Sequence, residues 1–262
     1  MNRSGPTGQV PVPRRPDRLG WRAKFGVIVP STNTVVEPEF HAMSVPGVTP
    51  HMSRIHIRDM HFADDDGMLR LLEQIRGEIG SAVDRVMTAQ PDYMVMGMSA
   101  ETFWDGLEGN RQFIAQIRER SGGLDVATGA EGCERALNLF GARRIGVITP
   151  YQPIGDENVV RFFSDLGFEV AAIKGLRCPH AIAIAEVTER QLMDAIDEVN
   201  QPDVDAIVQC GTNLCMSQIA DEAERWLDKP VIAINAATWW MALRDNGIED
   251  KVQGFGSLLR EH

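Results

Sequence analysis

The sequence predicts an α/β protein of two pseudo-symmetric Rossmann-like lobes, each with a parallel sheet, that face each other across a cleft. Apolar strand-like runs alternate with helical stretches along the chain, and this alternation calls for parallel strands joined by helical crossovers. The chain also repeats itself, because residues 25–30 (FGVIVP) are echoed at 145–150 (IGVITP) and residues 92–97 (DYMVMG) at 205–210 (DAIVQC). Two lobes of like topology would bring equivalent strand tips together in the cleft.

Composition and charge narrow the set of partners. The chain has 262 residues, is 44% hydrophobic and carries a net charge of −11 with a pI near 5.0. This acidity argues against nucleic acid or an anionic membrane as a partner, while backbone N–H groups can still make a site locally positive for an anionic small substrate. No apolar run is long enough to span a membrane and the N-terminus has no apolar signal core, so we expect a cytoplasmic protein with reduced thiols. The four cysteines match no zinc spacing, and we predict no metal.

The chain is expected to divide into a tail and two lobes. Residues 1–20 are rich in Pro, Gly and Arg without periodicity, which predicts a flexible tail. The first lobe is expected at 21–126 and the second at 127–235. Residues 236–262 are expected to return to the first lobe.

In the first lobe, the apolar run Lys24–Pro30 predicts a buried strand. The polar stretch Ser31–Thr34 follows it, at the place where ligands bind in such sheets, although these residue types are also favoured as helix caps. Asp64–Asp66 could suggest a metal, but adjacent acids are more typical of a solvated helix start. The remaining elements are expected as a helix from Glu37, a strand at His51–Ile57, a helix at 68–89, a strand at Pro91–Met96, a helix at 109–120 and a strand at Leu124–Ala127.

The second lobe repeats this alternation of strands and helices. Its expected elements are a helix at Ala130–Phe140, a strand and loop at Arg144–Tyr151, a helix at 154–166, a strand at Phe168–Ile173, a helix at 188–200, a strand ending at Cys210, a helix at 216–227, a strand at Val231–Asn235 and a closing helix at 237–246.

The stretch Asp205–Met216 carries the main chemical signal. An apolar strand leads there to Cys210, and glycine, hydroxyl and amide groups follow it in Gly211-Thr212-Asn213. A thiol at a strand tip, beside free backbone N–H groups, can act as acid, base or nucleophile. The alternative is a core cysteine, since free cysteine is among the most buried residue types. In the register of the repeat Gly97 is the counterpart of Cys210, so one strand tip carries a thiol and its mirror position carries none.

Four motifs taken together resemble the aspartate/glutamate racemase superfamily, in the branch of maleate cis–trans isomerases and arylmalonate decarboxylases. They are Val29–Thr34, Thr149-Pro150-Tyr151, Cys210-Gly211 and Val231–Trp240, and the resemblance covers about residues 24–255. It implies two lobes with a cofactor-free site between them that acts on small carboxylates.

The resemblance also implies how many thiols take part. Two-thiol members use cysteines at both strand tips, as opposed acid/base groups or, in maleate isomerases, as nucleophile and acid. Arylmalonate decarboxylases keep only the second-lobe cysteine and have glycine in the first-lobe place, the pattern that Gly97 and Cys210 match. Ser31–Thr34, in contrast, resembles the substrate-binding loop of the isomerases. Met98 departs from the decarboxylase pattern, which has a hydroxyl residue there.

Elementary chemistry favours decarboxylation for a single thiol. Isomerising maleate needs a nucleophile at one alkene carbon and an acid at the other, whereas loss of CO₂ from a malonate leaves an enediolate that needs hydrogen-bond donors and one proton donor. We therefore predict a cofactor-independent, arylmalonate-decarboxylase-like enzyme in which Cys210 exchanges the proton at the α-carbon. The carboxylate would be bound in a pocket formed by Asn33, Gly97, Ser99, Tyr151, Gly211 and Thr212. The alternatives are a maleate isomerase or racemase of the same fold, and a carboxylate-binding protein without turnover.

Three further positions complete the expectations. Glu101, just after the first-lobe tip, is either a second acid/base group or a helix cap. Cys215 is expected to pack in the helix that follows Cys210, and Trp239-Trp240 to pack at the lobe junction. The chain is also compatible with a homo-oligomer.

Overall fold

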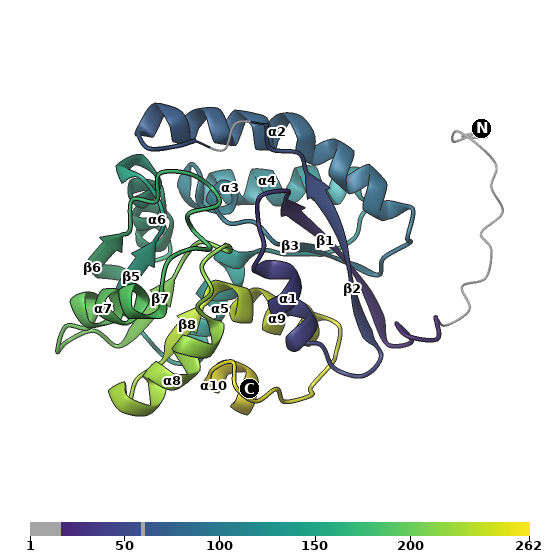
Figure 1. The fold of residues 1–262 in the computed structure, drawn as a ribbon. Coiled ribbons are helices and arrows are strands. Elements are labelled where there is room, and N and C mark those ends of the chain that lie inside the picture. The colour runs from purple at the N-terminus through teal and green to yellow at the C-terminus, as the bar shows by residue number, and fades with distance from the viewer. Residues whose placement is uncertain (1–16, 59–60) are drawn as a thin grey trace, which may run out of the picture.

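The computed structural model describes residues 17–58 and 61–262, and its fold consists of two four-stranded parallel sheets (Figure 1). The first sheet has the order β2-β1-β3-β4 and the second the order β6-β5-β7-β8. The strands are β1 (Ala23–Pro30), β2 (Val48–Ile55), β3 (Tyr93–Met96), β4 (Val126–Ala127), β5 (Arg144–Thr149), β6 (Glu169–Gly175), β7 (Ala206–Gln209) and β8 (Val231–Ala233). Each strand order maps onto the other when four is added to every number, which confirms the predicted pair of pseudo-symmetric lobes.

Helices connect these strands and cover both sheets. They are α1 (Val36–Ala42), α2 (Asp65–Met87), α3 (Ala100–Phe103), α4 (Gly106–Arg120), α5 (Gly129–Leu139), α6 (Pro153–Asp165), α7 (Glu189–Val199), α8 (Ser217–Leu227), α9 (Ile234–Asp245) and α10 (Ser257–Glu261). Figure 1 shows α2 and α4 on one side of the first sheet and α1 and α9 on the other. Among the described residues, no helix is both long and apolar enough to cross a membrane.

The internal repeat holds at the level of single hydrogen bonds. The Gly97 N–H donates to the Ile28 carbonyl, and the Cys210 N–H donates to the Ile148 carbonyl, both at 2.8 Å. Ile28 and Ile148 are the matching positions of the two central strands, since they pair with Met96 and Gln209 in their sheets. Gly97 and Cys210 are therefore equivalent residues of the two lobes, in the register that the sequence predicts.

One continuous apolar core joins the lobes. It includes Phe25 of β1 and Ile148 of β5, and both side chains are fully buried. The fully buried ring of Trp239 in α9 packs in this core, with its centroid 5.3 Å from that of Phe25 and 4.8 Å from that of Phe40. The packing predicted for Trp239 is confirmed, but these two partners belong to the first lobe, and its place at the lobe junction stays a prediction.

The structure corrects several predicted boundaries. The strand β2 begins at Val48, three residues before the expected start. It can include Pro50, which has no N–H to donate, because β2 lies at the edge of its sheet. Asn235 belongs to α9 and not to β8, and the short helices α3 and α10 were not predicted. Cys215 is exposed and precedes α8, so the prediction that it packs in that helix was wrong.

The expected tail lies largely outside the described residues, which begin at Asp17. The Asp17 carboxylate accepts hydrogen bonds from the N–H groups of Leu19 and Gly20. The lobe boundaries at 126/127 and 235/236 remain our proposal; α9 contacts β3 and β4, in keeping with a C-terminal segment that returns to the first lobe.

Candidate active site

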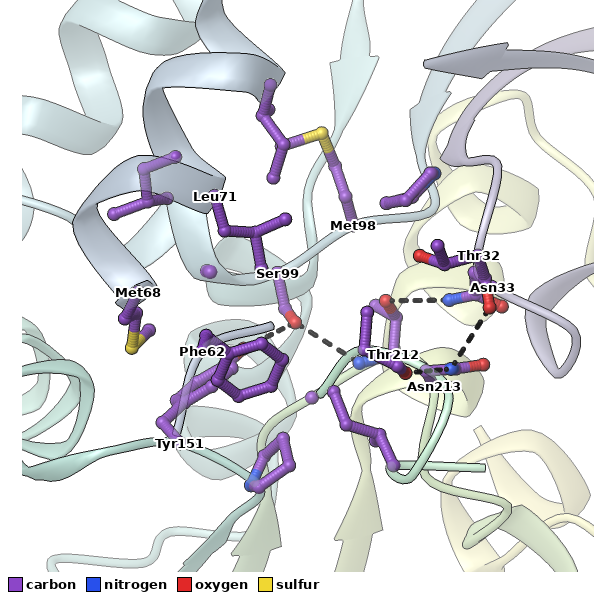
Figure 2. Close-up of a pocket in the computed structure, with 18 residues that line it drawn as sticks. Thr32, Asn33, Phe62, Met68, Leu71, Met98, Ser99, Tyr151, Thr212 and Asn213 are labelled. Carbon is purple, nitrogen blue, oxygen red and sulfur yellow. Dashed lines mark hydrogen bonds between the residues drawn. The ribbon is translucent and has the colours of Figure 1, made fainter. Parts of the chain in front are cut away.

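A cavity of about 70 Å³ lies where the carboxyl ends of the two sheets meet (Figure 2). Ligands in open α/β sheets bind at such ends. The first lobe lines it with Pro30, Thr32, Asn33, Phe62, Met68, Leu71, Leu72, Ile75, Met98, Ser99 and Ala100, and the second with Pro150, Tyr151, Ala181, Ile184, Gly211, Thr212 and Asn213. Five predicted site residues are therefore brought together: Asn33, Ser99, Tyr151, Gly211 and Thr212. Gly97 and Cys210 lie next to lining residues in the chain but are not themselves part of the lining.

The polar end of the cavity is a hydroxyl pair shared between the lobes. Ser99 Oγ and the Tyr151 hydroxyl lie 2.6 Å apart, and the Thr212 N–H donates to Ser99 Oγ at 3.1 Å. Burial raises the pKa of Tyr151, so the phenol keeps its proton across the whole neutral range. Since one of the two hydroxyls donates to the other, the pair retains one further O–H hydrogen for a ligand.

Tyr151 is held by a buried acid that sequence reasoning missed. The Tyr151 N–H donates to Thr149 Oγ1 at 3.2 Å, and that hydroxyl donates in turn to Asp156. Arg177 pairs with the same carboxylate at 2.6 Å and also donates to the Tyr151 carbonyl. Asp156 follows the Thr149-Pro150-Tyr151 motif at the first turn of α6, a position where an acid is common for purely local reasons. Its partner Arg177 is distant in sequence, so no local signal could identify it.

Asn33 and Thr212 use their polar groups within the protein. Asn33 Oδ1 accepts from the N–H groups of Val35 and Val36, and Asn33 Nδ2 donates to Thr212 Oγ1 at 3.3 Å. The Thr212 hydroxyl donates to the Gly97 carbonyl at 3.3 Å. Both residues line the cavity, and the Asn33–Thr212 and Thr212–Gly97 bonds join one lobe to the other.

Asn213 is a further contact between the lobes that was not predicted as a site residue. Its Oδ1 accepts from the Thr34 N–H at 3.0 Å, and its Nδ2 donates to the Ala181 carbonyl at 3.0 Å. Its place three residues after Cys210 was the only sequence signal.

The remaining wall of the cavity is apolar. Phe62 and one face of α2, with Met68, Leu71, Leu72 and Ile75, form it on the first-lobe side (Figure 2). The side chains of α2 repeat at the spacing of a helix face. Among the described residues, no lysine or arginine lines the cavity. A ligand therefore meets neutral donors at one end and hydrocarbon at the other.

Cys210 is fully buried and directly precedes the lining residue Gly211 in the chain. Gly211 has a φ of +116°, a conformation that favours glycine, and a Cβ there would lie 2.5 Å from Pro150. Burial, followed by the nearby Cys133 and Asp156, raises the pKa of the Cys210 thiol well above its usual value. The group is therefore a neutral thiol at neutral pH, a state that can give a proton and cannot readily add as a nucleophile.

Glu101 does not line the cavity. It lies on the far side of α3, where its carboxylate accepts from Arg76 Nε at 2.7 Å and lines a groove between α2 and α4. Burial raises the pKa of Glu101 despite this ion pair. Of the two open alternatives, a second acid/base group in the cavity is disfavoured by this placement.

Comparison with known proteins gives the family. A family model described as arylmalonate decarboxylase matches residues 25–259. The chain belongs to this family. Its relatives include the maleate isomerase of Pseudomonas putida, 27% identical over 250 residues, which cover 90% of this chain and 96% of the relative. The arylmalonate decarboxylase of Bordetella bronchiseptica is 29% identical over 171 residues, which cover 64% of this chain and 70% of the relative.

A solved structure agrees with the fold. The maleate isomerase Iso from Pseudomonas putida S16 superposes with a TM-score of 0.82 at 25% identity, over 91% of this chain and 98% of that chain. The predicted resemblance to the maleate isomerase and arylmalonate decarboxylase branch is confirmed.

Proposed function

We propose that this member of the arylmalonate decarboxylase family removes CO₂ from a malonate-type diacid that bears an apolar substituent. The observation that carries the proposal is the division of the cavity into one cluster of neutral donors and one hydrocarbon wall. The donor cluster suits the carboxylate that is retained. The apolar wall suits the substituent and leaves the departing carboxylate poorly solvated.

The reaction needs one proton donor and no base. The bond between the α-carbon and the departing carboxylate breaks, and its electron pair moves into the retained carboxylate to give an enediolate and CO₂. The free O–H of the Ser99–Tyr151 pair donates to an enediolate oxygen, and such a donor is typically worth about 3 kcal/mol in a dry site. The Cys210 S–H then gives its proton to the α-carbon, and water returns a proton to the thiolate.

The ionisation of Cys210 supports this role. Its raised pKa keeps the thiol protonated until the carbanion forms, which is the state required of the donor. A buried thiolate is also a strong base, so it recovers a proton quickly after turnover.

Substrate binding has to widen the cavity. Ligand pockets typically measure about 300 Å³ or more, well above the 70 Å³ present here, and Cys210 is reached only when the wall at Gly211 moves. Phe62 of the first lobe and Ala181 of the second both line the cavity. Beside them the Phe62 N–H donates to the Pro179 carbonyl at 3.1 Å, and His61 pairs with His180 in an isolated antiparallel bridge. These contacts lie outside both sheets, so they can open without disturbing either sheet.

The second candidate is maleate cis–trans isomerisation. It is supported by the maleate isomerase relatives that match along nearly their whole length and by the placement of Thr32 and Asn33 on the cavity wall. Gly97 counts against it, because the strand tip opposite Cys210 has no nucleophile. Racemisation meets the same objection, and family membership favours an enzyme over a carboxylate-binding protein without turnover. A cytoplasmic location and self-association remain predictions.

The test is a proton NMR assay in D₂O. Wild type and Cys210→Ala are incubated separately with phenylmalonate, methyl-phenylmalonate, maleate and the two enantiomers of aspartate. We expect loss of CO₂ from the substituted malonates, with one deuteron placed at the α-carbon, and at least a hundredfold slower reaction in Cys210→Ala, the order of magnitude for loss of a positioned proton donor. Conversion of maleate to fumarate without malonate turnover would favour isomerisation and contradict the proposal.

A further inference from the structure

A buried carboxylate lies behind the cavity, at the junction of the two lobes. Glu39, on the inner face of α1, has 9% of its surface exposed. Its Oε2 accepts from Asn235 Nδ2 at 2.6 Å and from Ser217 Oγ at 2.8 Å, and its Oε1 accepts from the Ser217 N–H at 3.3 Å. No lysine or arginine of the described chain forms a salt bridge with it, and burial raises its pKa. A carboxylate in such surroundings is costly to bury, so it is retained only where several donors satisfy it.

Asn235 connects this carboxylate to the cavity wall. Its Nδ2 carries two hydrogens; one is donated to Glu39 and the other to the Thr212 carbonyl at 2.9 Å. The other side of the amide, Oδ1, is buried without a hydrogen-bond partner. The orientation of the amide is nevertheless determined, because a reversed amide would place an oxygen against two acceptors.

Among the described residues, the other hydrogen bonds of Thr212 run to the first lobe. Its N–H donates to Ser99 Oγ and its hydroxyl to the Gly97 carbonyl, and both of these partners belong to the first lobe. The bond from Asn235 to the Thr212 carbonyl therefore fixes the remaining polar group of Thr212, a residue two positions from Cys210. The Gly211 carbonyl accepts from Gln209 Nε2 at 2.8 Å and from the Leu214 N–H at 3.1 Å, so the bond from Asn235 to Thr212 is a further restraint on the three residues Cys210-Gly211-Thr212.

We propose that Glu39 is a positioning residue that acts through Asn235 on the Thr212 carbonyl and so holds the Cys210 turn in place. A carboxylate fits this role because it offers two acceptor oxygens to three donors, from Ser217 and Asn235, whereas an amide offers one. Its effect on turnover rests on the proposed function, but its effect on the position of the thiol does not.

The chain offers a matched control. Ser217→Ala removes a hydrogen bond to the same Glu39 carboxylate, at 2.8 Å, but leaves the link from Glu39 through Asn235 to Thr212 intact. Asn235→Leu removes that link while keeping a side chain of similar size. Asn235→Ser has one donor hydrogen for two acceptors and serves as a second variant should the leucine variant fail to fold. Glu39→Gln weakens the carboxylate end of the link.

The first readout is the rate at which iodoacetamide alkylates Cys210 in the folded proteins, measured by mass spectrometry against the exposed Cys215 as internal reference. We expect Cys210 to react about tenfold faster in the Asn235 variants and in Glu39→Gln, because this factor corresponds to one lost hydrogen bond. In Ser217→Ala it should react at the wild-type rate. The second readout is turnover of phenylmalonate, where kcat should fall about tenfold in the same variants with little change in KM.

Three outcomes are distinguishable. Equal Cys210 reactivity in the Asn235, Glu39 and Ser217 variants would overturn the proposal and leave Glu39 with a purely structural role in the contact between the lobes. Faster alkylation together with the fall in kcat would support it. Faster alkylation in the Asn235 and Glu39 variants, together with no turnover of malonates by the wild type, would support the positioning role and overturn the proposed function.

Discussion

At the scale of single residues, the Tyr151 hydroxyl is the donor on which the proposed enediolate depends most. It lies 2.6 Å from Ser99 Oγ, both residues line the cavity, and burial keeps the phenol protonated. Its backbone is fixed on both sides, by Thr149 at the N–H and by Arg177 at the carbonyl. The hydroxyl is thus fixed before substrate arrives, which is the condition for efficient stabilisation of a developing charge.

Tyr151→Phe should lower kcat for decarboxylation by about a hundredfold, the usual effect of removing one donor to an oxyanion. The fold should be retained, because only the hydroxyl is lost from a ring that stays packed. Tyr93→Phe is the matched control, since Tyr93 is the other of the two tyrosines and also loses a hydroxyl bonded at 2.6 Å, to Asp245, away from the cavity. Steady-state kinetics on both variants checks this, and an equal loss in the two would exclude a specific role for Tyr151.

The glycine at the first-lobe tip is constrained by its neighbours. A Cβ at Gly97 would lie 2.9 Å from Val36 Cγ1 and 3.2 Å from the Ile28 carbonyl oxygen. We expect Gly97→Cys to lower the free energy of unfolding by about 1–3 kcal/mol through overpacking, and Gly97→Cys combined with Val36→Ala to remove the clash with the valine. Urea unfolding of both variants and of Val36→Ala measures the coupling. Additive losses would show that the valine is not the obstacle.

The same substitution tests the alternative function. If the missing thiol alone separates this chain from an isomerase, the folded double variant should convert maleate to fumarate while the wild type does not. A wild type that already isomerises maleate would contradict the argument from Gly97.

The positions of some candidate site residues were accessible from the sequence and those of others were not. Cys210, Ser99, Tyr151 and Gly211 follow strand tips, and strand tips can be located from apolar runs. The bond between Asn33 and Thr212 joins residues 179 positions apart in the chain and leaves no local pattern.

At the scale of elements, α2 forms the apolar wall of the cavity. Its N-cap Asp64 accepts from the Gly67 N–H at 2.7 Å, which confirms that the acidic run is a helix start. Among the described residues there is no group of three metal-ligating side chains. The helix then presents Met68, Leu71, Leu72 and Ile75 to the cavity.

Placing a cation on this wall should slow decarboxylation. Leu71→Arg would stabilise the charged ground state of the departing carboxylate, so kcat for phenylmalonate should fall by about tenfold or more, the effect of one charge-assisted hydrogen bond made before the transition state. Leu69→Arg, on the exposed face of the same helix, is the control and should leave kcat unchanged. Faster turnover in Leu71→Arg would contradict the assignment of the departing group to the apolar wall.

The long elements were predictable and the short ones were not. A helix such as α2 has several turns of periodic sequence, whereas α3 has four residues and offers no period to detect. At the end of β8, Asn235 continues an apolar run without a break, so the change from strand to helix has no composition signal. That boundary matters, because it places Asn235 in the first turn of α9, beside Glu39 and Thr212.

At the scale of the whole molecule, the internal repeat predicts most of the architecture. Matching strand sequences imply matching sheets, and equivalent tips imply a site between them. The repeat does not predict how the lobes are fastened together. The bonds of Asn213 to Thr34 and of Glu39 to Ser217 lie outside the repeated motifs and join segments far apart in the chain.

The partly buried Glu131 should make the stability of the protein depend on pH in a direction opposite to that of an ordinary ion pair. Burial, reinforced by Glu134, raises the pKa of Glu131 from 4.5 to about 7. Between those values the folded protein keeps a proton that the unfolded chain has released, so the contribution is complete below pH 4.5 and is lost as the pH rises towards 7. This loss amounts to at most about 3 kcal/mol.

Glu131→Gln carries no titrating group, so its free energy of unfolding should fall less than that of wild type between pH 5 and pH 8 in urea titrations. Glu157→Gln, which removes an exposed charge, should follow the wild type. Parallel pH profiles for all three proteins would show that Glu131 titrates alike in the folded and unfolded chain.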